Sequence, residues 1–230
     1  MKLLTSPGDQ MVNLYRMILQ ALPDTCCRII EVAAAHSGEG VSTVVLGLAE
    51  AACNVANARV LLCDATVDRN NLRFFGVTPS LPSLSEVASG GADARQAIEH
   101  KRASLTLREP GFLRKEITFS LASAGISLCA VAKVGAELEL ATHVDRLDPI
   151  FTTLRQQYEL ILIDSPAITE SSLGPALAKK ADRVVLVIEA DRTRVPVVAA
   201  AARTIEINGG QLLGAVLNKR RFRIPRLFYR

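Results

Sequence analysis

The chain has 230 residues, of which 49% are apolar and 22% are charged, a composition that fits one α/β domain with a sizeable core. No stretch approaches the ~20 consecutive apolar residues of a membrane-spanning helix, and residues 1–9 lack the apolar region of a signal peptide, so we expect a cytoplasmic protein. Six cations lie in residues 219–230, and removing them from the net charge of +4 leaves −2 for residues 1–218, so nucleic-acid binding is not expected.

Short apolar runs alternate with helical stretches, which predicts a mostly parallel sheet with helices on both faces. In chain order, the first half predicts a helix over 14–22, a strand over 28–34, a tight loop over 36–40, a helix over 42–57 and strands over 59–63 and 128–132. The strands are continuous apolar runs, as expected for parallel strands that are buried on both faces.

The second half continues the alternation. It predicts a helix over 140–158, a strand over 160–163, a helix over 173–180, a strand over 183–189, a helix over 195–207 and a strand over 212–217. We therefore predict one α/β domain over residues 1–218 and a basic, aromatic tail over 219–230. The segment 92–127 has no clear pattern and is interpreted as an insertion or a surface excursion.

The five cysteines form no C-x-x-C pair and no cluster with histidine. Cys63 and Cys129 lie within apolar runs, where a reduced cysteine behaves as a small hydrophobic residue. We expect structural roles for all of them, Cys26, Cys27 and Cys53 included.

A glycine-rich loop between the first strand and its helix is the strongest local pattern. Residues 38–43 (Gly-Glu-Gly-Val-Ser-Thr) open the helix, so backbone N–H groups can converge there on an anion. A strict phosphate loop has a lysine immediately before the Ser or Thr, and Val41 occupies that position here. Ser42 remains as a hydroxyl ligand for Mg²⁺. Taken alone, the loop is also compatible with an ordinary tight turn.

Two further apolar strands end in an aspartate, Asp64 and Asp164. Carboxylates at the carboxyl ends of parallel strands lie beside the crevice where such folds bind ligands. Two of them near a phosphate loop suit Mg²⁺, which prefers oxygen ligands. The alternative is that each aspartate caps the turn or helix that follows it.

These motifs, in this order, resemble the bacterial tyrosine kinases (BY-kinases). Those are cytoplasmic P-loop domains that partner membrane polysaccharide co-polymerases of capsule and exopolysaccharide export, and they are related to the MinD/ParA ATPases. The resemblance rests on Gly38-Glu39-Gly40-x-Ser42-Thr43, Leu61-Leu62-Cys63-Asp64-Ala65, Ile161-Leu162-Ile163-Asp164-Ser165-Pro166 and Val216-Leu217-Asn218.

The resemblance implies ATP and Mg²⁺ as cofactors and assigns residues to them. Asp64 is the candidate for activating a tyrosine hydroxyl, and Asp164 helps to hold Mg²⁺ through water, together with Ser42 and Asp64. Tyr229 is the candidate phosphate acceptor in the tail. The nucleotide-binding set comprises Gly38, Glu39, Gly40, Val41, Ser42, Thr43 and, near the base, Asn218.

Three departures from the family favour a degenerate kinase, or pseudokinase. Val41 replaces the phosphate-loop lysine. The second motif reads Asp64-Ala65-Thr66, where the family has Asp-x-Asp. The tail holds one tyrosine, Tyr229, and no tyrosine cluster.

The first hypothesis is therefore a BY-kinase-like regulatory or scaffold protein, peripheral to the inner membrane, that acts with a polysaccharide co-polymerase. The alternative is an active tyrosine kinase or ATPase that uses a displaced cation, such as Lys179, Lys180 or Arg69. A MinD/ParA-like positioning ATPase is a third hypothesis, although His36 lies where those proteins carry a second lysine.

The tail from Lys219 to Arg230 interleaves six cations with aromatic and aliphatic side chains. This pattern favours binding to an anionic membrane surface or to a membrane partner, whereas the alternative is a solvated terminus. The resemblance also implies homo-oligomers, because Arg16 echoes an arginine-bearing helix of family rings.

Overall fold

The computed structural model describes residues 7–23, 27–66, 83–90, 102–107, 115–120, 126–131 and 137–220. Its centre is a sheet of six strands in the order β5-β2-β6-β1-β7-β8, and every neighbouring pair is parallel. The strands are β1 (Arg28–Ala34), β2 (Val60–Asp64), β5 (Ile126–Ala130), β6 (Leu160–Asp164), β7 (Arg183–Glu189) and β8 (Leu212–Asn218). The predicted parallel sheet is confirmed.

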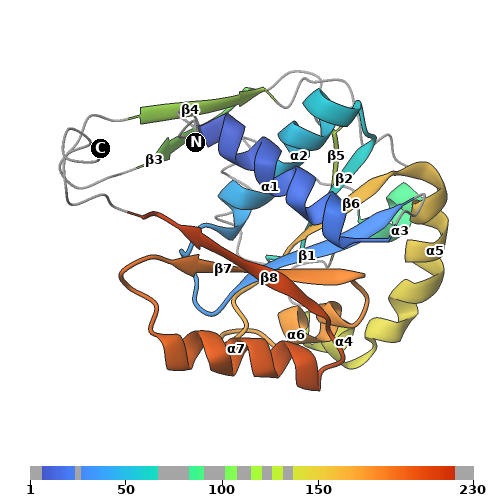
Figure 1. The fold of residues 1–230 in the computed structure, drawn as a ribbon. Helices are drawn as coiled ribbons and strands as arrows, with labels where there is room; N and C mark the ends of the chain where they lie inside the picture. The colour runs from blue at the N-terminus through green and yellow to red at the C-terminus, as the bar shows by residue number, and fades with distance from the viewer. Residues whose placement is uncertain are drawn as a thin grey trace, which may run out of the picture.

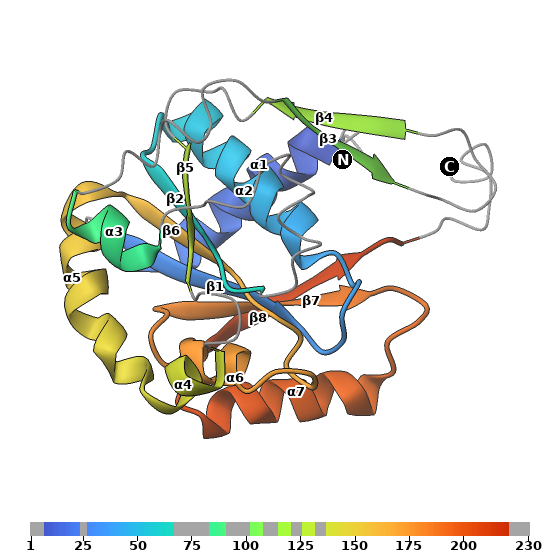
Figure 2. The same ribbon diagram turned by 180° about the vertical axis from the view of Figure 1, so that it is seen from behind.

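Helices cover both faces of this sheet (Figures 1 and 2). Because side chains alternate along a strand, Ile30 and Val32 pack beneath α1 and α2, and Ile29 packs on the opposite face. The helices on the first face are α1 (Pro7–Ala21) and α2 (Val41–Ala56). Those on the second face are α3 (Leu84–Ala88), α4 (Glu137–Thr142), α5 (Asp148–Gln157), α6 (Leu173–Ala178) and α7 (Val195–Ile207).

The prediction of a single helix over 140–158 is wrong. The structure has α4, a 3₁₀ turn (Val144–Leu147) and then α5, with His143 between them at φ −119° and ψ 34°. Pro149 lies in the first turn of α5, where its missing N–H costs nothing, whereas a proline inside one continuous helix removes a hydrogen bond. The apolar spacing alone did not reveal this break.

Two strands lie within the segment that the sequence left unassigned. β3 (Arg102–Leu107) and β4 (Lys115–Ser120) pair antiparallel as a separate two-stranded ribbon. The ribbon lies at the end of the molecule where α1 begins (Figures 1 and 2). The interpretation as an excursion from the main sheet is consistent with this arrangement.

The four cysteines in the described ranges, Cys27, Cys53, Cys63 and Cys129, are buried and form no disulfide with one another. Cys63 and Cys129 occupy register-paired positions of β2 and β5, with their sulfurs 3.5 Å apart. Their surroundings are apolar, as expected of structural cysteines. Cys26 lies outside the described residues.

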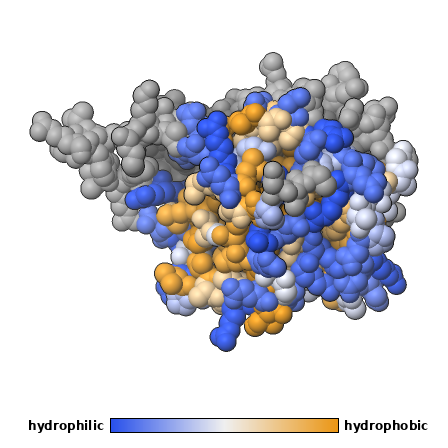
Figure 3. Space-filling model, turned by 45° about the vertical axis from the view of Figure 1, so that its right-hand side comes forward, coloured by the Kyte–Doolittle hydropathy of each residue, from blue (hydrophilic) through white to orange (hydrophobic). Residues whose placement is uncertain are grey.

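Apolar side chains also reach the surface. The large exposed ones include Met17 on α1, Leu217 on β8 and Ile207 on α7. Figure 3 shows hydrophobic residues gathered left of the centre, on the face that β8 presents in Figure 1. Among the described helices, none has the length and apolarity to cross a bilayer.

Candidate functional site

The glycine-rich loop joins the end of β1 to the start of α2, and its backbone requires glycine. Gly38 has φ +80° and Gly40 has φ +102°, a region that other residues rarely adopt. A Cβ atom at Gly40 would lie 2.2 Å from the amide nitrogen of Asn218. No side chain caps α2 and no acid lies in its first turn. The N–H groups at this helix end are therefore available to an anion.

Glu39 holds the loop in shape. Its side chain is buried, and one carboxylate oxygen accepts hydrogen bonds from the N–H groups of Ala35 at 3.0 Å and His36 at 3.4 Å. The other oxygen accepts the hydroxyl of Thr193. The Asn218 amide donates to the Glu39 carbonyl at 2.9 Å. The sequence placed Glu39 and Asn218 near a nucleotide, and the structure brings both into the loop framework.

Val41 occupies the position where a phosphate loop carries lysine. Its side chain is half-buried and packs against the core cluster between the sheet and the two helices α1 and α2. Ser42 and Thr43, the next two residues, are also half-buried at the start of α2. The position that neutralises phosphate charge in a strict phosphate loop therefore contributes packing here.

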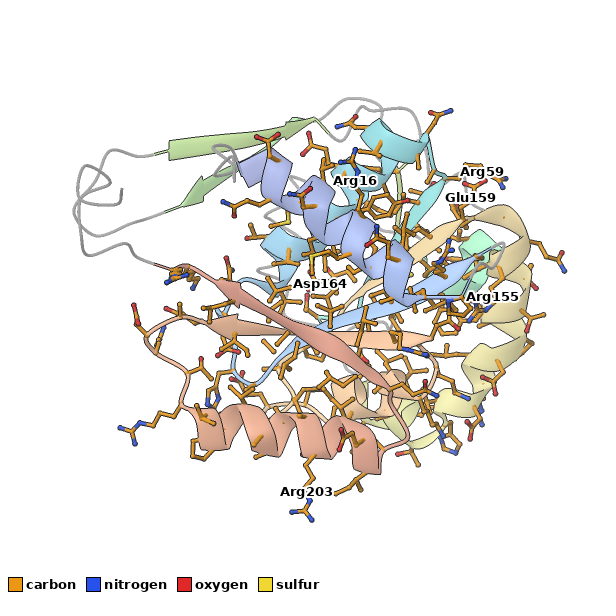
Figure 4. All side chains as sticks on the ribbon, in the orientation of Figure 1. Arg16, Arg59, Arg155, Glu159, Asp164 and Arg203 are labelled. Carbon is orange, nitrogen blue, oxygen red and sulfur yellow. The ribbon has the colours of Figure 1, made fainter. Side chains whose placement is uncertain are left out.

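Asp64 and Asp164 lie side by side, because β2 and β6 are neighbours and these two residues are register partners. Both are buried. Asp64 accepts the Thr66 N–H at 2.8 Å and the Thr66 hydroxyl, so the capping alternative holds for one of its oxygens. Within the described residues, neither oxygen of Asp164 has a hydrogen bond of ordinary geometry, although the Ser42 hydroxyl lies near enough to act on its pKa. Asp164 lies near the centre of the molecule in Figure 4.

Burial raises the pKa of both carboxyls. The pKa of Asp164 rises to about 8, through burial first and then through the nearby negative charge of Asp64, and the Ser42 hydroxyl opposes the rise. The pKa of Asp64 rises to about 6, again through burial, and its hydrogen bonds from Thr66 oppose the rise. Two buried carboxyls with unsatisfied oxygens suit a cation.

The donor set fits Mg²⁺ held largely through water. Ser42, Asp64 and Asp164 offer oxygen ligands, and Mg²⁺ usually keeps several of its waters beside one or two carboxylates. The described residues contain no group of three or more His, Cys, Asp or Glu that could enclose a metal ion. An ion at these strand ends would be completed by a phosphate rather than by protein alone.

Glu31 is a buried acid that the sequence analysis overlooked. It lies within β1, is fully buried, and neither of its oxygens has a hydrogen bond of ordinary geometry among the described residues. Burial raises its pKa to about 8, and the hydroxyl of Ser165 opposes the rise. A charged residue inside the run Ile-Ile-Glu-Val-Ala was the available sign in the sequence.

Two of the three cations suggested as replacements for the missing lysine are engaged elsewhere. Lys180 lies 2.6 Å from both Asp145 and Asp148, and Lys179 lies 2.9 Å from Asp145. Arg69 lies outside the described residues. These two lysines therefore stabilise the surroundings of α6.

Lys219 is the cation that the structure places at the loop. Its ammonium group donates to the carbonyl of Gly38 and lies 3.2 Å from Glu189. The sequence analysis assigned Lys219 to the tail. Tyr229 and residues 221–230 lie outside the described part of the chain.

No family model matches the chain. Its structure superposes on the kinase domain of the Escherichia coli tyrosine kinase ETK with a TM-score of 0.72 and 20% identity, covering 96% of this chain and 79% of that domain. The chain has the fold of a bacterial tyrosine-kinase domain. The fold is shared with nucleotide-binding enzymes. One of them is cobyrinic acid a,c-diamide synthase from Mycobacterium smegmatis, whose structure contains bound ADP and magnesium. It matches with a TM-score of 0.56 and 22% identity, covering 83% of this chain and 74% of that chain.

Two curated proteins are similar to the chain in sequence. An ATP-binding protein of unassigned function from Methanocaldococcus jannaschii is 26% identical over 193 residues, which cover 83% of this chain and 64% of the relative. The CapB protein of Staphylococcus aureus, named as a tyrosine-protein kinase, is 37% identical over 70 residues, or 30% of this chain and 31% of CapB. The chain thus spans less than two thirds of the length of either relative.

Proposed function

We propose that this chain is a BY-kinase-like regulatory or scaffold protein of exopolysaccharide or capsule biosynthesis, with impaired or absent kinase activity. The observation that carries the proposal is Val41, a half-buried apolar residue that packs against the core where a kinase needs a lysine. Phosphoryl transfer depends on positioning and on neutralising charge at the phosphates. Loss of one such preorganised charge costs roughly 10²–10³ in rate in other enzymes.

ATP and Mg²⁺ remain the ligands that the site suits best. The loop offers the helix N–H groups, and Ser42, Asp64 and Asp164 offer oxygen atoms for Mg²⁺. Relatives of similar fold or sequence are named as nucleotide-binding proteins, which supports weak binding here. In this proposal the nucleotide, where it binds, stabilises a conformation and its phosphate is not transferred.

The partner in this proposal is a membrane polysaccharide co-polymerase, which would hold the protein at the cytoplasmic face of the inner membrane. The exposed apolar residues Met17 and Leu217 provide contact surface for that partner or for further copies of the chain. Clustered surface hydrophobic residues often mark such contacts. The basic tail, which ends at Arg230, adds attraction to anionic lipid.

The alternative is an active kinase with a displaced cation, and the position of Lys219 favours it. Its ammonium group already touches the loop at Gly38. However, this ammonium group pairs with Glu189 and donates to a loop carbonyl, so its charge is already engaged. We therefore keep the scaffold function as the conclusion.

A phosphotransfer assay separates the two functions. We expect no Mg²⁺-dependent transfer of radiolabelled phosphate from ATP to Tyr229 or to a co-polymerase cytoplasmic segment, because the loop lacks its lysine. The matched control is the Asp64→Ala variant, whose signal gives the background of the assay. Transfer by the native protein that disappears in both Asp64→Ala and Asp164→Ala would establish the enzyme and overturn the scaffold proposal.

A further inference from the structure

The two outer strands of the central sheet differ in how their edges are protected. At one edge, β5 is almost wholly buried, Ser83 forms a β-bridge to Ala130, and α3 packs in the same apolar cluster. At the other edge, β8 pairs with β7 alone among the described residues, and it crosses the front of the molecule in Figure 1. Gly214, Ala215 and Leu217 of β8 are exposed. An open strand edge of this kind is a template for pairing with another chain.

The sequence of β8 does little to block such pairing. Proteins protect open edges with charged residues, proline or a bulge, and the seven residues of β8 include no charge and no proline. One irregularity lies near its start, where Val184 pairs with Leu212 and Val185 with Gly214. From Gly214 to Asn218 the pairing with β7 is regular. The segment that can accept a further strand is therefore 214–218.

The ladder with β7 decides which backbone groups face outward. The carbonyl of Asn218 points to β7, because it accepts the N–H of Ala190 at 2.9 Å. Successive residues of a strand point these groups to opposite sides, so the N–H and C=O groups of Ala215 and Leu217 point to the open edge. The side chain of Leu217 is also 56% exposed. Outward backbone groups and an exposed apolar side chain thus coincide.

A second copy of β8 fits this edge when it runs antiparallel about a two-fold axis at Val216. Ala215 of each copy then lies opposite Leu217 of the other, and each such pair exchanges two N–H···O=C hydrogen bonds. The large side chain of Leu217 lies beside the small one of Ala215, and apolar cross-strand pairs stabilise a sheet. Because a two-fold interface uses one patch twice, these residues satisfy both copies.

The charges beyond the ends of β8 favour the antiparallel arrangement. Lys219, which pairs with Glu189, and Arg220 follow the strand directly. At the other end, α7 finishes shortly before β8 and has no basic residue in its last turn. Antiparallel strands bring the cations of one copy toward the carboxyl end of α7 in the other, which is the negative end of the helix dipole.

We propose that β8 is a dimerisation edge, at which two copies of this chain pair antiparallel and join their sheets into one. The interface is separate from α1, whose Arg16 echoes the rings of the resembling family. It needs neither a nucleotide nor a polysaccharide partner, so it stands or falls independently of the proposed function.

Sedimentation velocity of the full chain, without nucleotide and at about 1–100 µM, tests the inference. We expect a dimer whose fraction rises with concentration. Ala215→Lys should weaken dimerisation at least about tenfold, because it sets an ammonium group against Leu217 of the other copy. Ala215 is exposed, so the variant should keep the circular dichroism of the native protein. The control is Val55→Lys on α2, which packs over β1, β2 and β6 instead of β8 and should dimerise normally.

Val216→Cys tests the register. Residues on the axis form a pair without mutual backbone hydrogen bonds, with Cα atoms about 4.5 Å apart, a separation that a disulfide spans. Oxidised glutathione should link the two thiols into a covalent dimer and leave two molecules of reduced glutathione. Val55→Cys and the native chain, which carries its own cysteines, should not form this dimer.

Four results would overturn the inference. A monomer at every concentration excludes a second copy as the occupant and leaves the edge to another protein. Equal weakening in Val55→Lys reduces the effect to net charge. An oligomer that is lost in Arg16→Ala and kept in Ala215→Lys assigns assembly to α1. A dimer in which Val216→Cys is not linked excludes the two-fold pairing about that residue.

Discussion

Replacement of Glu31 by methionine is expected to stabilise the folded protein at pH 8 by about 1–3 kcal/mol, the usual cost of a buried polar group without partners. Glu31 is fully buried, its oxygens have no hydrogen bond of ordinary geometry among the described residues, and the Ser165 hydroxyl beside it offsets only part of the cost of burial. Methionine has a similar volume and no polar atoms, so it fills the same space in the core. The variant should also lose part of the pH dependence of stability.

The sign of that dependence follows from the pKa. The Glu31 carboxyl keeps its proton up to about pH 8 in the folded protein, whereas its ordinary value is 4.5. Between these values folding takes up a proton, so the free energy of unfolding falls as pH rises through this window. Asp164, whose pKa also rises to about 8, contributes in the same direction and remains in the variant.

Urea unfolding at pH 5 and pH 8 measures the effect on the native protein, Glu31→Met and Glu31→Gln. Both variants should show a smaller difference between the two pH values than the native protein. The control is Glu206→Gln on the exposed surface of α7, which should change nothing. If both Glu31 variants keep the full pH dependence of the native protein, the pKa of the Glu31 carboxyl does not differ between the folded and the unfolded state.

Val41→Lys is expected to raise the affinity for Mg²⁺-ATP by about 10–100-fold. A charge-assisted hydrogen bond to phosphate contributes roughly 1.5–3 kcal/mol, and each 1.4 kcal/mol is a factor of ten. Val41 is only half-buried, so a lysine stem can lie on the same apolar surface while its ammonium group reaches the loop.

Titration with a fluorescent ATP analogue, with and without Mg²⁺, measures this gain. Val55→Lys is the matched control, because Val55 lies on the same helix and is 44% exposed, and it should bind no better than the native protein. Mg²⁺-dependent micromolar binding by the native protein would mean that another cation, with Lys219 the first candidate, has replaced the lysine.

The sheet and the two aspartates were predictable because their determinants are local. Each buried parallel strand is a continuous apolar run, and Asp64 and Asp164 follow such runs directly. Once strands are parallel, their carboxyl ends share one edge, so the proximity of the aspartates follows from topology. Gly38 and Gly40 likewise mark the two loop positions where the backbone adopts a positive φ.

Other features depend on contacts between distant residues. Lys219 reaches Gly38 across 181 positions of sequence, so composition placed it in the basic tail. The charge of Glu31 inside an apolar run was visible in the sequence, but its full burial depends on the layers that pack on the sheet and its neighbour Ser165 lies far along the chain. Pro149 was the sign of a break before α5 in the sequence, but the helical spacing of apolar residues on both sides of it favoured one continuous helix.

The most direct test of the scaffold function is exopolysaccharide output in a deletion strain that expresses an Asp64→Asn, Asp164→Asn double variant. Both substitutions keep the side-chain shape and remove the carboxylates that any phosphate transfer through Mg²⁺ requires. The account predicts output equal to that with the native protein, at equal protein level. Loss of output to the level of the deletion strain, with the variant folded and present at the native level, would contradict it.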